Sequence, residues 1–276
     1  MIDTLTDIFK SMTKALDVLY VIEGAKEVSR LMADEEQLKS YKDFFNKNNL
    51  FFATSDFKIK KEIDENKFSN KGIKLPLNAD GHYFVYISKS KEKAEKAKKA
   101  EQENNHKELG RLLGYPECCI NFFIKYSPAE SKKKNDYVLA SLNESKGLIF
   151  PFYNNIAIRH LDLSLLSHFP CNLHCKESIK IAENNLRIIE KHSKEIAEIF
   201  IGMLKSAVLY TDNQGIFLLR EFRLENNILF YNKIMSHTNN LLYEKLKNSD
   251  SIEVIDDNNI RISNKKIENT GIMVFI

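Results

Sequence analysis

Hydrophobic residues recur every three or four positions through the first part of the chain. This spacing predicts an amphipathic helix over residues 5–22, and a second apolar set predicts another helix over residues 28–45. Residues 51–59 and 82–88 are rich in aromatic and β-branched side chains, so we expect strands there. Pro76 restricts the segment between these strands to an edge strand or a loop.

Residues 89–107 are almost wholly charged. They combine lysines and glutamates with strong helix formers, which is typical of a solvated helix or a mobile linker with local ion pairs. A basic strip that binds RNA would carry interleaved aromatic residues and fewer glutamates. We therefore do not expect this segment to bind nucleic acid.

The spacing of apolar residues over residues 108–200 indicates a mainly helical block. After it, the sequence pattern changes from that of helices to that of strands. Strand-like segments joined by turn residues follow at 207–210, 216–223, 228–232, 251–255, 260–263 and 272–276, with a short helix at 241–246. We predict an α+β fold whose central helical block bears every cysteine. N-terminal helices with short strands flank this block on one side, and a C-terminal antiparallel β region flanks it on the other. The expected regions are 1–107, 108–200 and 201–276.

Composition and charge limit the class of protein but do not indicate a particular reaction. The chain has 276 residues, 43% of them hydrophobic, so it can bury a core without disulfides. The 41 basic and 38 acidic residues leave a net charge of +3. This charge is too small to attract nucleic acid by long-range electrostatics. No apolar stretch is long enough to span a membrane, and the first residues lack the pattern of a secretory signal. A cytoplasmic protein is expected.

The four cysteines cluster in the middle of the chain, in two motifs that each contain a proline. In the first motif, Gly114 is suited to end one helix and Pro116 to begin the next, which places Cys118 and Cys119 in its first turn. Free backbone N–H groups and the helix dipole favour a thiolate at such a position.

The second motif has the sequence HFPCNLHC. We predict that Pro170 begins a helix that runs to about residue 199, so that Cys171 and Cys175, four residues apart, share one face of it. His168 lies just before this helix. The repeated arrangement suggests that the sulfur atoms of both motifs converge on one site.

Thiolates at helix starts are good ligands for zinc or for an iron–sulfur cluster. The candidate metal ligands are Cys118, Cys119, Cys171, Cys175 and His168. Adjacent residues leave a helix about 100° apart, so only one of Cys118 and Cys119 is expected to ligate, which leaves the other packed or reactive. These two are therefore also the candidate catalytic residues. A site without metal, in which one cysteine attacks and a neighbour resolves the disulfide, stays open.

Polar side chains between the two motifs are candidates for binding a substrate. Asn154 and Asn155 can form hydrogen bonds with a ligand, and Arg159 can hold an anion. The alternative is that the asparagines cap a helix and the arginine forms a surface ion pair. The common nucleotide-binding and hydrolase motifs are absent from the sequence.

The strings LGYPECC at residues 113–119 and HFPCNLHC at residues 168–175, with two asparagines between them, resemble an uncharacterised family. It is a prokaryotic, largely archaeal family of unknown function with paired GYPxCC and HxPCxxxC motifs. The resemblance covers about residues 108–186. It implies that the cysteines and His168 belong to the family's motif positions, and it implies no activity.

The sequence thus predicts a cytoplasmic protein that binds a metal ion or an iron–sulfur cluster, with redox or sulfur-transfer chemistry on a small-molecule or macromolecular substrate as the leading interpretation. One alternative is a binding module in which structural zinc supports a surface for a protein or RNA partner. The other is a thiol redox protein without metal. Whether the protein is an enzyme is left open by the residues alone.

Overall fold

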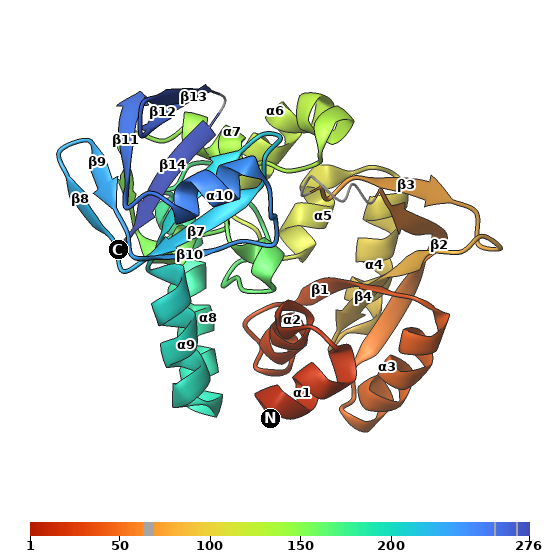
Figure 1. Cartoon of the computed structure of the whole chain (residues 1–276). Coiled ribbons are helices and arrows are strands. Elements are labelled where there is room, and N and C mark those ends of the chain that lie inside the picture. The colour runs from red at the N-terminus through yellow and green to blue at the C-terminus, as the bar shows by residue number, and fades with distance from the viewer. Residues whose placement is uncertain (63–68, 257, 269) are drawn as a thin grey trace.

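The N-terminal part of the chain forms a four-stranded antiparallel sheet with helices on both faces (Figure 1). The computed structural model describes residues 1–62, 69–256, 258–268 and 270–276. The strand order is β1-β4-β2-β3, with bounds β1 (Val28–Ala33), β2 (Phe51–Lys61), β3 (Gly72–Leu75) and β4 (His82–Ser88). The helices of this part are α1 (Ile2–Phe9), α2 (Met12–Ile22), α3 (Glu35–Lys47), α4 (Lys91–Gln102) and α5 (His106–Leu112).

The prediction of one helix over residues 28–45 is wrong in its first half. Residues Val28–Ala33 form β1, which pairs antiparallel with β4, and α3 starts only after Asp34 caps its N-terminus. Helices cover both faces of β1: Leu31 contacts one core and Val28 another. A strand buried on both faces is nearly continuously apolar, so its sequence can be mistaken for part of a buried helix.

The charged segment forms α4, so the helix interpretation is confirmed and the linker interpretation is wrong. Most of its charged residues face outward, whereas Ala94, Ala97 and Ala100 are buried against the sheet and Glu101 pairs with Arg30 of β1. The three alanines repeat every third position and form a narrow apolar stripe that packs on β2 and β4. The expectation for Pro76 holds as well, because β3 is the edge strand and ends at Leu75.

The central part of the chain is mainly helical, as predicted. Its elements are α6 (Glu117–Lys133), α7 (Val138–Asn143), β5 (Ile149–Phe150), the short 3-10 helices η1 (Phe152–Asn154) and η2 (Arg159–Leu161), α8 (Lys176–His192) and α9 (Lys194–Leu204). Helices α8 and α9 stand together below the C-terminal sheets in Figure 1. The segment between η1 and α8 contains the second cysteine motif.

Two five-stranded sheets make up the C-terminal part, and their mainly antiparallel pairing confirms the predicted α+β class. The first has the order β10-β7-β6-β14-β5 and the second the order β13-β12-β11-β9-β8. The bounds are β6 (Ala207–Thr211), β7 (Ile216–Arg220), β8 (Arg223–Glu225), β9 (Ile228–Phe230), β10 (Lys233–Met235), α10 (Leu241–Lys247), β11 (Ser251–Asp256), β12 (Asn259–Ile262), β13 (Lys265–Glu268) and β14 (Thr270–Phe275).

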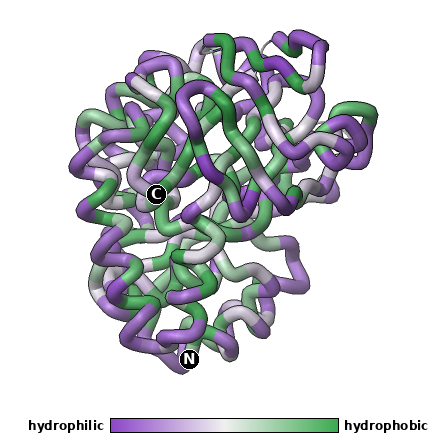
Figure 2. Tube along the Cα trace, turned by 60° about the vertical axis from the view of Figure 1, so that its left-hand side comes forward, coloured by the Kyte–Doolittle hydropathy of each residue, from purple (hydrophilic) through white to green (hydrophobic). Residues whose placement is uncertain are grey.

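Alternate residues of the first of these sheets point into two different cores. Val208 and Tyr210 of β6 contact the core shared with the N-terminal helices, whereas Ala207 and Leu209 face the second sheet. Figure 2 shows hydrophobic segments inside the molecule and hydrophilic segments along its outer turns. Strand β5 of the central part pairs in parallel with β14, so the C-terminal sheet includes a piece of the helical block.

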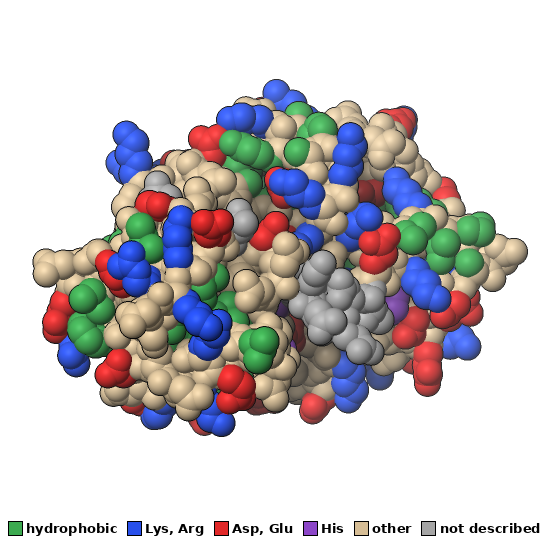
Figure 3. Space-filling model, turned by 45° about the horizontal axis from the view of Figure 1, so that its top comes forward, with side chains coloured by type: hydrophobic (Ala, Val, Ile, Leu, Met, Phe, Trp, Pro, Cys, Tyr) green, Lys and Arg blue, Asp and Glu red, His purple; other side chains and the backbone are tan. Residues whose placement is uncertain are grey.

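The surface carries both signs of charge. Acidic and basic side chains are interspersed on the face shown in Figure 3, with no large area of a single sign. Among the helices of the described residues, none is long and apolar enough to cross a membrane. The three expected regions, 1–107, 108–200 and 201–276, stay a prediction.

Candidate metal centre

The first cysteine motif lies at the start of α6, as the sequence predicts. Gly114 adopts a left-handed conformation with φ of +76° after α5, and Pro116 is the residue that caps α6. Cys118 and Cys119 follow in the first helical turn. The side chain of Glu117 forms an ion pair with Arg111 of α5 on the exposed side of the two helices.

The second motif is built differently from our expectation. Pro170 does not begin a helix: residues 171–174 form a turn, and α8 starts at Lys176 with Cys175 as its N-cap. Asn172 stabilises this turn, because its side-chain oxygen accepts a hydrogen bond from the backbone N–H of His174. Cys171 and Cys175 therefore do not share a helical face, and the turn brings Cys171 toward the cluster from another side.

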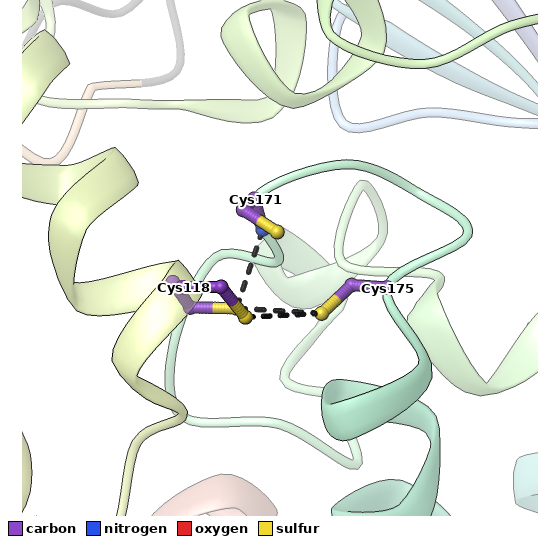
Figure 4. Close-up of side chains that lie close together, drawn as sticks. Cys118, Cys171 and Cys175 are labelled. Carbon is purple, nitrogen blue, oxygen red and sulfur yellow. Dashed lines mark hydrogen bonds between the residues drawn. The ribbon is translucent and has the colours of Figure 1, made fainter.

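The four sulfur atoms nevertheless meet at one point. The Sγ atom of Cys175 lies 3.7 Å from that of Cys118 and 3.7 Å from that of Cys119. The two adjacent cysteines have Sγ atoms 3.8 Å apart, although we expected one of them to point away. With Cys171, all four Sγ atoms lie within 4.8 Å of one another. Figure 4 shows Cys118 on α6 opposite Cys171 and Cys175 on the second motif.

Positive ends of helices and hydrogen-bond donors surround the cluster. The N-termini of α6 and α8 both point at it, so two helix dipoles favour negative charge on the sulfur atoms. The backbone N–H of Cys171 donates to the Sγ atom of Cys119 at 3.3 Å. The side-chain amide of Asn172 lies 3.5 Å from the Sγ atom of Cys171, and the Oγ atom of Ser178 lies 3.2 Å from that of Cys119.

Hydrogen bonding within the cluster lowers the pKa of the Cys175 thiol and raises the pKa of the Cys119 and Cys171 thiols. Hydrogen bonds from Cys119 and Cys171 hold the pKa of Cys175 far below its usual value. Donation to Cys171 and Cys175, together with burial, raises the pKa of Cys119. The hydrogen bond from Cys119 acts to lower the pKa of Cys171, but donation to Cys175 and burial outweigh it and raise that pKa to about 12. A divalent cation would allow all the thiols to ionise together.

His168 lies outside the group of sulfur atoms, although the sequence made it a candidate ligand. Its Nε2 atom forms a hydrogen bond of 2.9 Å with the Oγ atom of Ser178, which in turn contacts Cys119. Burial lowers the pKa of His168 to about 3, so its ring is neutral at physiological pH. The histidine thus orients Ser178 toward the cluster. Sequence reasoning missed Ser178, whose place three residues beyond Cys175 on α8 was the available signal.

Asn154 and Asn155, the candidate substrate residues, are both buried and hold backbone in place. The amide of Asn154 donates to the carbonyl oxygens of Leu173 and Cys175, at 3.1 and 3.3 Å. The amide of Asn155 donates to the carbonyl oxygen of Leu204 at 2.8 Å. Asn154 therefore supports the turn that carries the second motif, and Asn155 joins the central block to the end of α9.

Arg159, the third candidate, lies away from the sulfur atoms. Its guanidinium group lies over the ring of Phe169, 5.1 Å from the centroid, and also lines a cavity next to the second motif. The alternative interpretation of Arg159, a surface ion pair, does not apply in the part of the chain that the structure describes. The structure thus brings the four cysteines together, with His168 and Asn154 behind them, and places Arg159 in a separate cavity.

Comparison with known proteins gives one match. Residues 94–204 match the model of a family described as "Protein of unknown function (DUF483)". No curated protein and no solved structure matches the chain. The matched range contains both cysteine motifs and extends beyond residues 108–186, over which we expected the resemblance. The part of the chain that carries the four cysteines thus matches the model of an uncharacterised domain family, which confirms the expected resemblance to a family of unknown function.

Proposed function

We propose that the four cysteines bind a single tetrahedral metal ion, that zinc is the ion best suited to them, and that the ion stabilises the fold of the central block. The observation that carries this proposal is the spacing of the sulfur atoms. Zinc–sulfur bonds of about 2.3 Å in a tetrahedron place the sulfur atoms about 3.8 Å apart. The distances among the Sγ atoms of Cys118, Cys119 and Cys175 are 3.7, 3.7 and 3.8 Å.

The same spacing argues against an iron–sulfur cluster. Such a cluster distributes its thiolate ligands over different iron atoms, which holds some of the sulfur atoms much farther apart than the ligands of one ion. Here all four Sγ atoms lie within 4.8 Å of one another. One ion with four cysteine ligands is a closed site, since no coordination position is left for substrate or water.

The surroundings support a stabilising role. Four thiolates and one Zn²⁺ carry a net charge of about −2, which the starts of α6 and α8 and the donors around the sulfur atoms would offset. The ion would connect α6 to the start of α8 across more than fifty residues of sequence, between Cys119 and Cys171. Ordering such a long connection is a role typical of structural zinc.

The test is metal analysis of the purified full chain together with its visible spectrum. We expect colourless protein with one zinc per chain, and a tetrathiolate spectrum after substitution with Co²⁺. Cys171→Ser and Cys175→Ser should lose the metal, whereas His174→Ala, the matched control, should retain it because His174 is exposed and bonds the carbonyl oxygen of Lys146. Brown protein containing iron and sulfide, or protein with four titratable thiols and no metal, would contradict the proposal.

One observation favours a second candidate function. Cys118 is exposed, whereas Cys119 and Cys175 are buried, so one residue of the cluster is open to solvent. An exposed thiol next to an ionised neighbour is suited to thiol redox or sulfur-transfer chemistry in the reducing cytoplasm. This candidate predicts that mild oxidation releases the metal and forms a disulfide that includes Cys118. Full protection of Cys118 from an alkylating reagent in the metal-bound protein would count against it.

A further inference from the structure

A cavity of about 420 Å³ lies between the N-terminal helices and the segment that leads into the second cysteine motif. One wall comes from α2 and β1, and the opposite wall comes from residues 159–167. The volume is within the range of sites that hold small molecules. The cavity is separate from the metal centre, because none of the four cysteines lines it.

Positive side chains dominate the lining of this cavity. Lys14, Lys61 and Arg159 all line it, and among the described residues none of them has an ion-pair partner. The chain brings them from α2, from the end of β2 and from η2, so three distant segments contribute one charge each. Lys14 lies in the first turn of α2, where the helix dipole disfavours a cation. The fold thus places positive charge at a position where it lowers the stability of the protein.

The three cations act on one another. Burial lowers the pKa of Lys14 and the charge of Lys61 adds to this effect, although Asp34 and Asp162 act in the opposite direction. Desolvation and the charge of Arg159 lower the pKa of Lys61, whose side chain is exposed over much of its surface. Like charges that lower the pKa of their neighbours repel, and an anion between them would remove this repulsion.

The two acidic residues that line the cavity, Asp17 and Asp162, offset only part of this positive charge. The carboxylate of Asp17 pairs with Lys26 at 2.7 Å and accepts a hydrogen bond from Ser167. The carboxylate of Asp162 caps α2, accepting from the hydroxyl group of Ser11 at 2.8 Å and from the backbone of the first turn. The positive charge of the cavity is therefore available to a ligand.

We propose that this cavity binds a small molecule that carries a phosphate monoester or a diphosphate group, held by Lys14, Lys61 and Arg159. A group with two or more negative charges matches three cations that lack partners. The guanidinium group of Arg159 is fixed against Phe169 and can offer two parallel N–H donors to phosphate oxygens. The limited volume of the cavity favours a small molecule over the extended backbone of a nucleic acid. The proposal goes beyond the metal centre and does not depend on which ion is bound there.

Calorimetric titration of the full chain, as purified with its metal, with inorganic pyrophosphate provides the test, with inorganic phosphate as a weaker probe. We expect saturable binding of one pyrophosphate and a rise in melting temperature. Lys14→Gln, Lys61→Gln and Arg159→Gln should each weaken binding about tenfold or more, because each removes a charged hydrogen-bond donor. Lys245→Gln is the matched control, since it removes one charge from α10 outside the cavity.

Several outcomes would overturn the proposal. No saturable binding at millimolar pyrophosphate, or equal weakening by Lys245→Gln, would show that the cavity has no specific anion site. An RNA oligonucleotide that binds more tightly than pyrophosphate, with the same three substitutions abolishing it, would show that the cations serve a macromolecule. Lys61 lies on the exposed end of β2, so its variant separates loss of the anion site from loss of the fold or of the metal.

Discussion

The hydroxyl group of Tyr115 donates a hydrogen bond to the backbone carbonyl oxygen of Ser167 at 3.1 Å. Tyr115 belongs to the turn before α6, which carries the first cysteine motif, and Ser167 immediately precedes His168 of the second. Both residues also line the basic cavity. One hydrogen bond thus connects the support of the metal centre to the wall of the proposed anion site.

Removal of this hydrogen bond should weaken the fold without removing a metal ligand. Tyr115→Phe leaves the ring, which lies 5.0 Å from that of His168, and deletes only the hydroxyl group. We expect a loss of ~1 kcal/mol in the free energy of unfolding, measured by urea denaturation. Tyr153→Phe is a suitable control because no hydrogen bond of its hydroxyl group is described. Equal effects of the two substitutions would refute the role of this bond.

Ser178 should matter for metal affinity although it is not a ligand. Its hydroxyl group connects the neutral ring of His168 to the sulfur atom of Cys119. Residues behind metal ligands typically change affinity by roughly 10- to 100-fold, so Ser178→Ala should raise the dissociation constant by about this factor. Competition with a chromophoric chelator measures it. Ser131→Ala, on the exposed part of α6, serves as the control, and an unchanged affinity in Ser178→Ala would count against the role.

Asp136 should make the protein less stable as the pH rises. Burial raises the pKa of its carboxyl group above the usual 3.8, although hydrogen bonds from Tyr210 and from the backbone of Val138 act in the opposite direction. The folded protein therefore binds this proton more tightly than the unfolded chain does. The resulting stabilisation is complete below the unfolded pKa and is lost as the pH rises through the folded pKa.

Asp136→Asn, which keeps the shape of the side chain, removes this titration. We expect the melting temperature of the natural protein to fall relative to that of the variant as the pH rises from about 4 through the folded-state pKa of Asp136, and the difference then to level off. Thermal unfolding of both proteins over this range measures the effect. Parallel curves would show that the carboxyl group has the same pKa in both states.

The hydroxyl group of Tyr20 should destabilise the fold. Tyr20 is only 2% exposed, and within the described chain its hydroxyl oxygen has no hydrogen-bond partner. A buried polar group without a partner costs about 1–3 kcal/mol, so Tyr20→Phe should increase the free energy of unfolding by an amount within that range. Urea denaturation checks this, with Tyr41→Phe as the comparison, since the hydroxyl group of Tyr41 donates to the carbonyl oxygen of Phe9. That second substitution should destabilise, and a loss of stability in both would contradict the prediction.

The sequence predicts those features that depend on local chemistry. Pro116 after Gly114 indicates the start of α6, and it does so because both residues restrict the backbone directly. Alternating apolar residues and turn residues likewise indicate the main strands of the C-terminal sheets. The convergence of Cys118, Cys119, Cys171 and Cys175 could be inferred because both pairs follow a proline in similar motifs. Scattered cysteines without a shared site would not require such a repeated motif.

The features that the sequence does not reveal depend on contacts between distant segments. Pro170 is followed by a turn rather than a helix because the side chain of Asn172 accepts a local backbone hydrogen bond. This bond competes with helix formation, and the presence of a proline does not predict it. Strand β1 depends on pairing with β4. Lys14 and Lys61 meet Arg159 only in the folded chain, so no local pattern marks them as one site.

The position of β14 has a consequence for how the protein folds. This strand follows every other element in the sequence, yet it lies between β6 and β5 in the sheet and contributes Met273 and Phe275 to the core shared with the N-terminal helices. Its partner β5 lies more than a hundred residues earlier. Contacts of such long sequence separation slow folding, so during synthesis the sheet stays open until β14 has left the ribosome. Until then β6 and β5 expose unpaired edges, which makes the incomplete chain prone to aggregate or to need a chaperone.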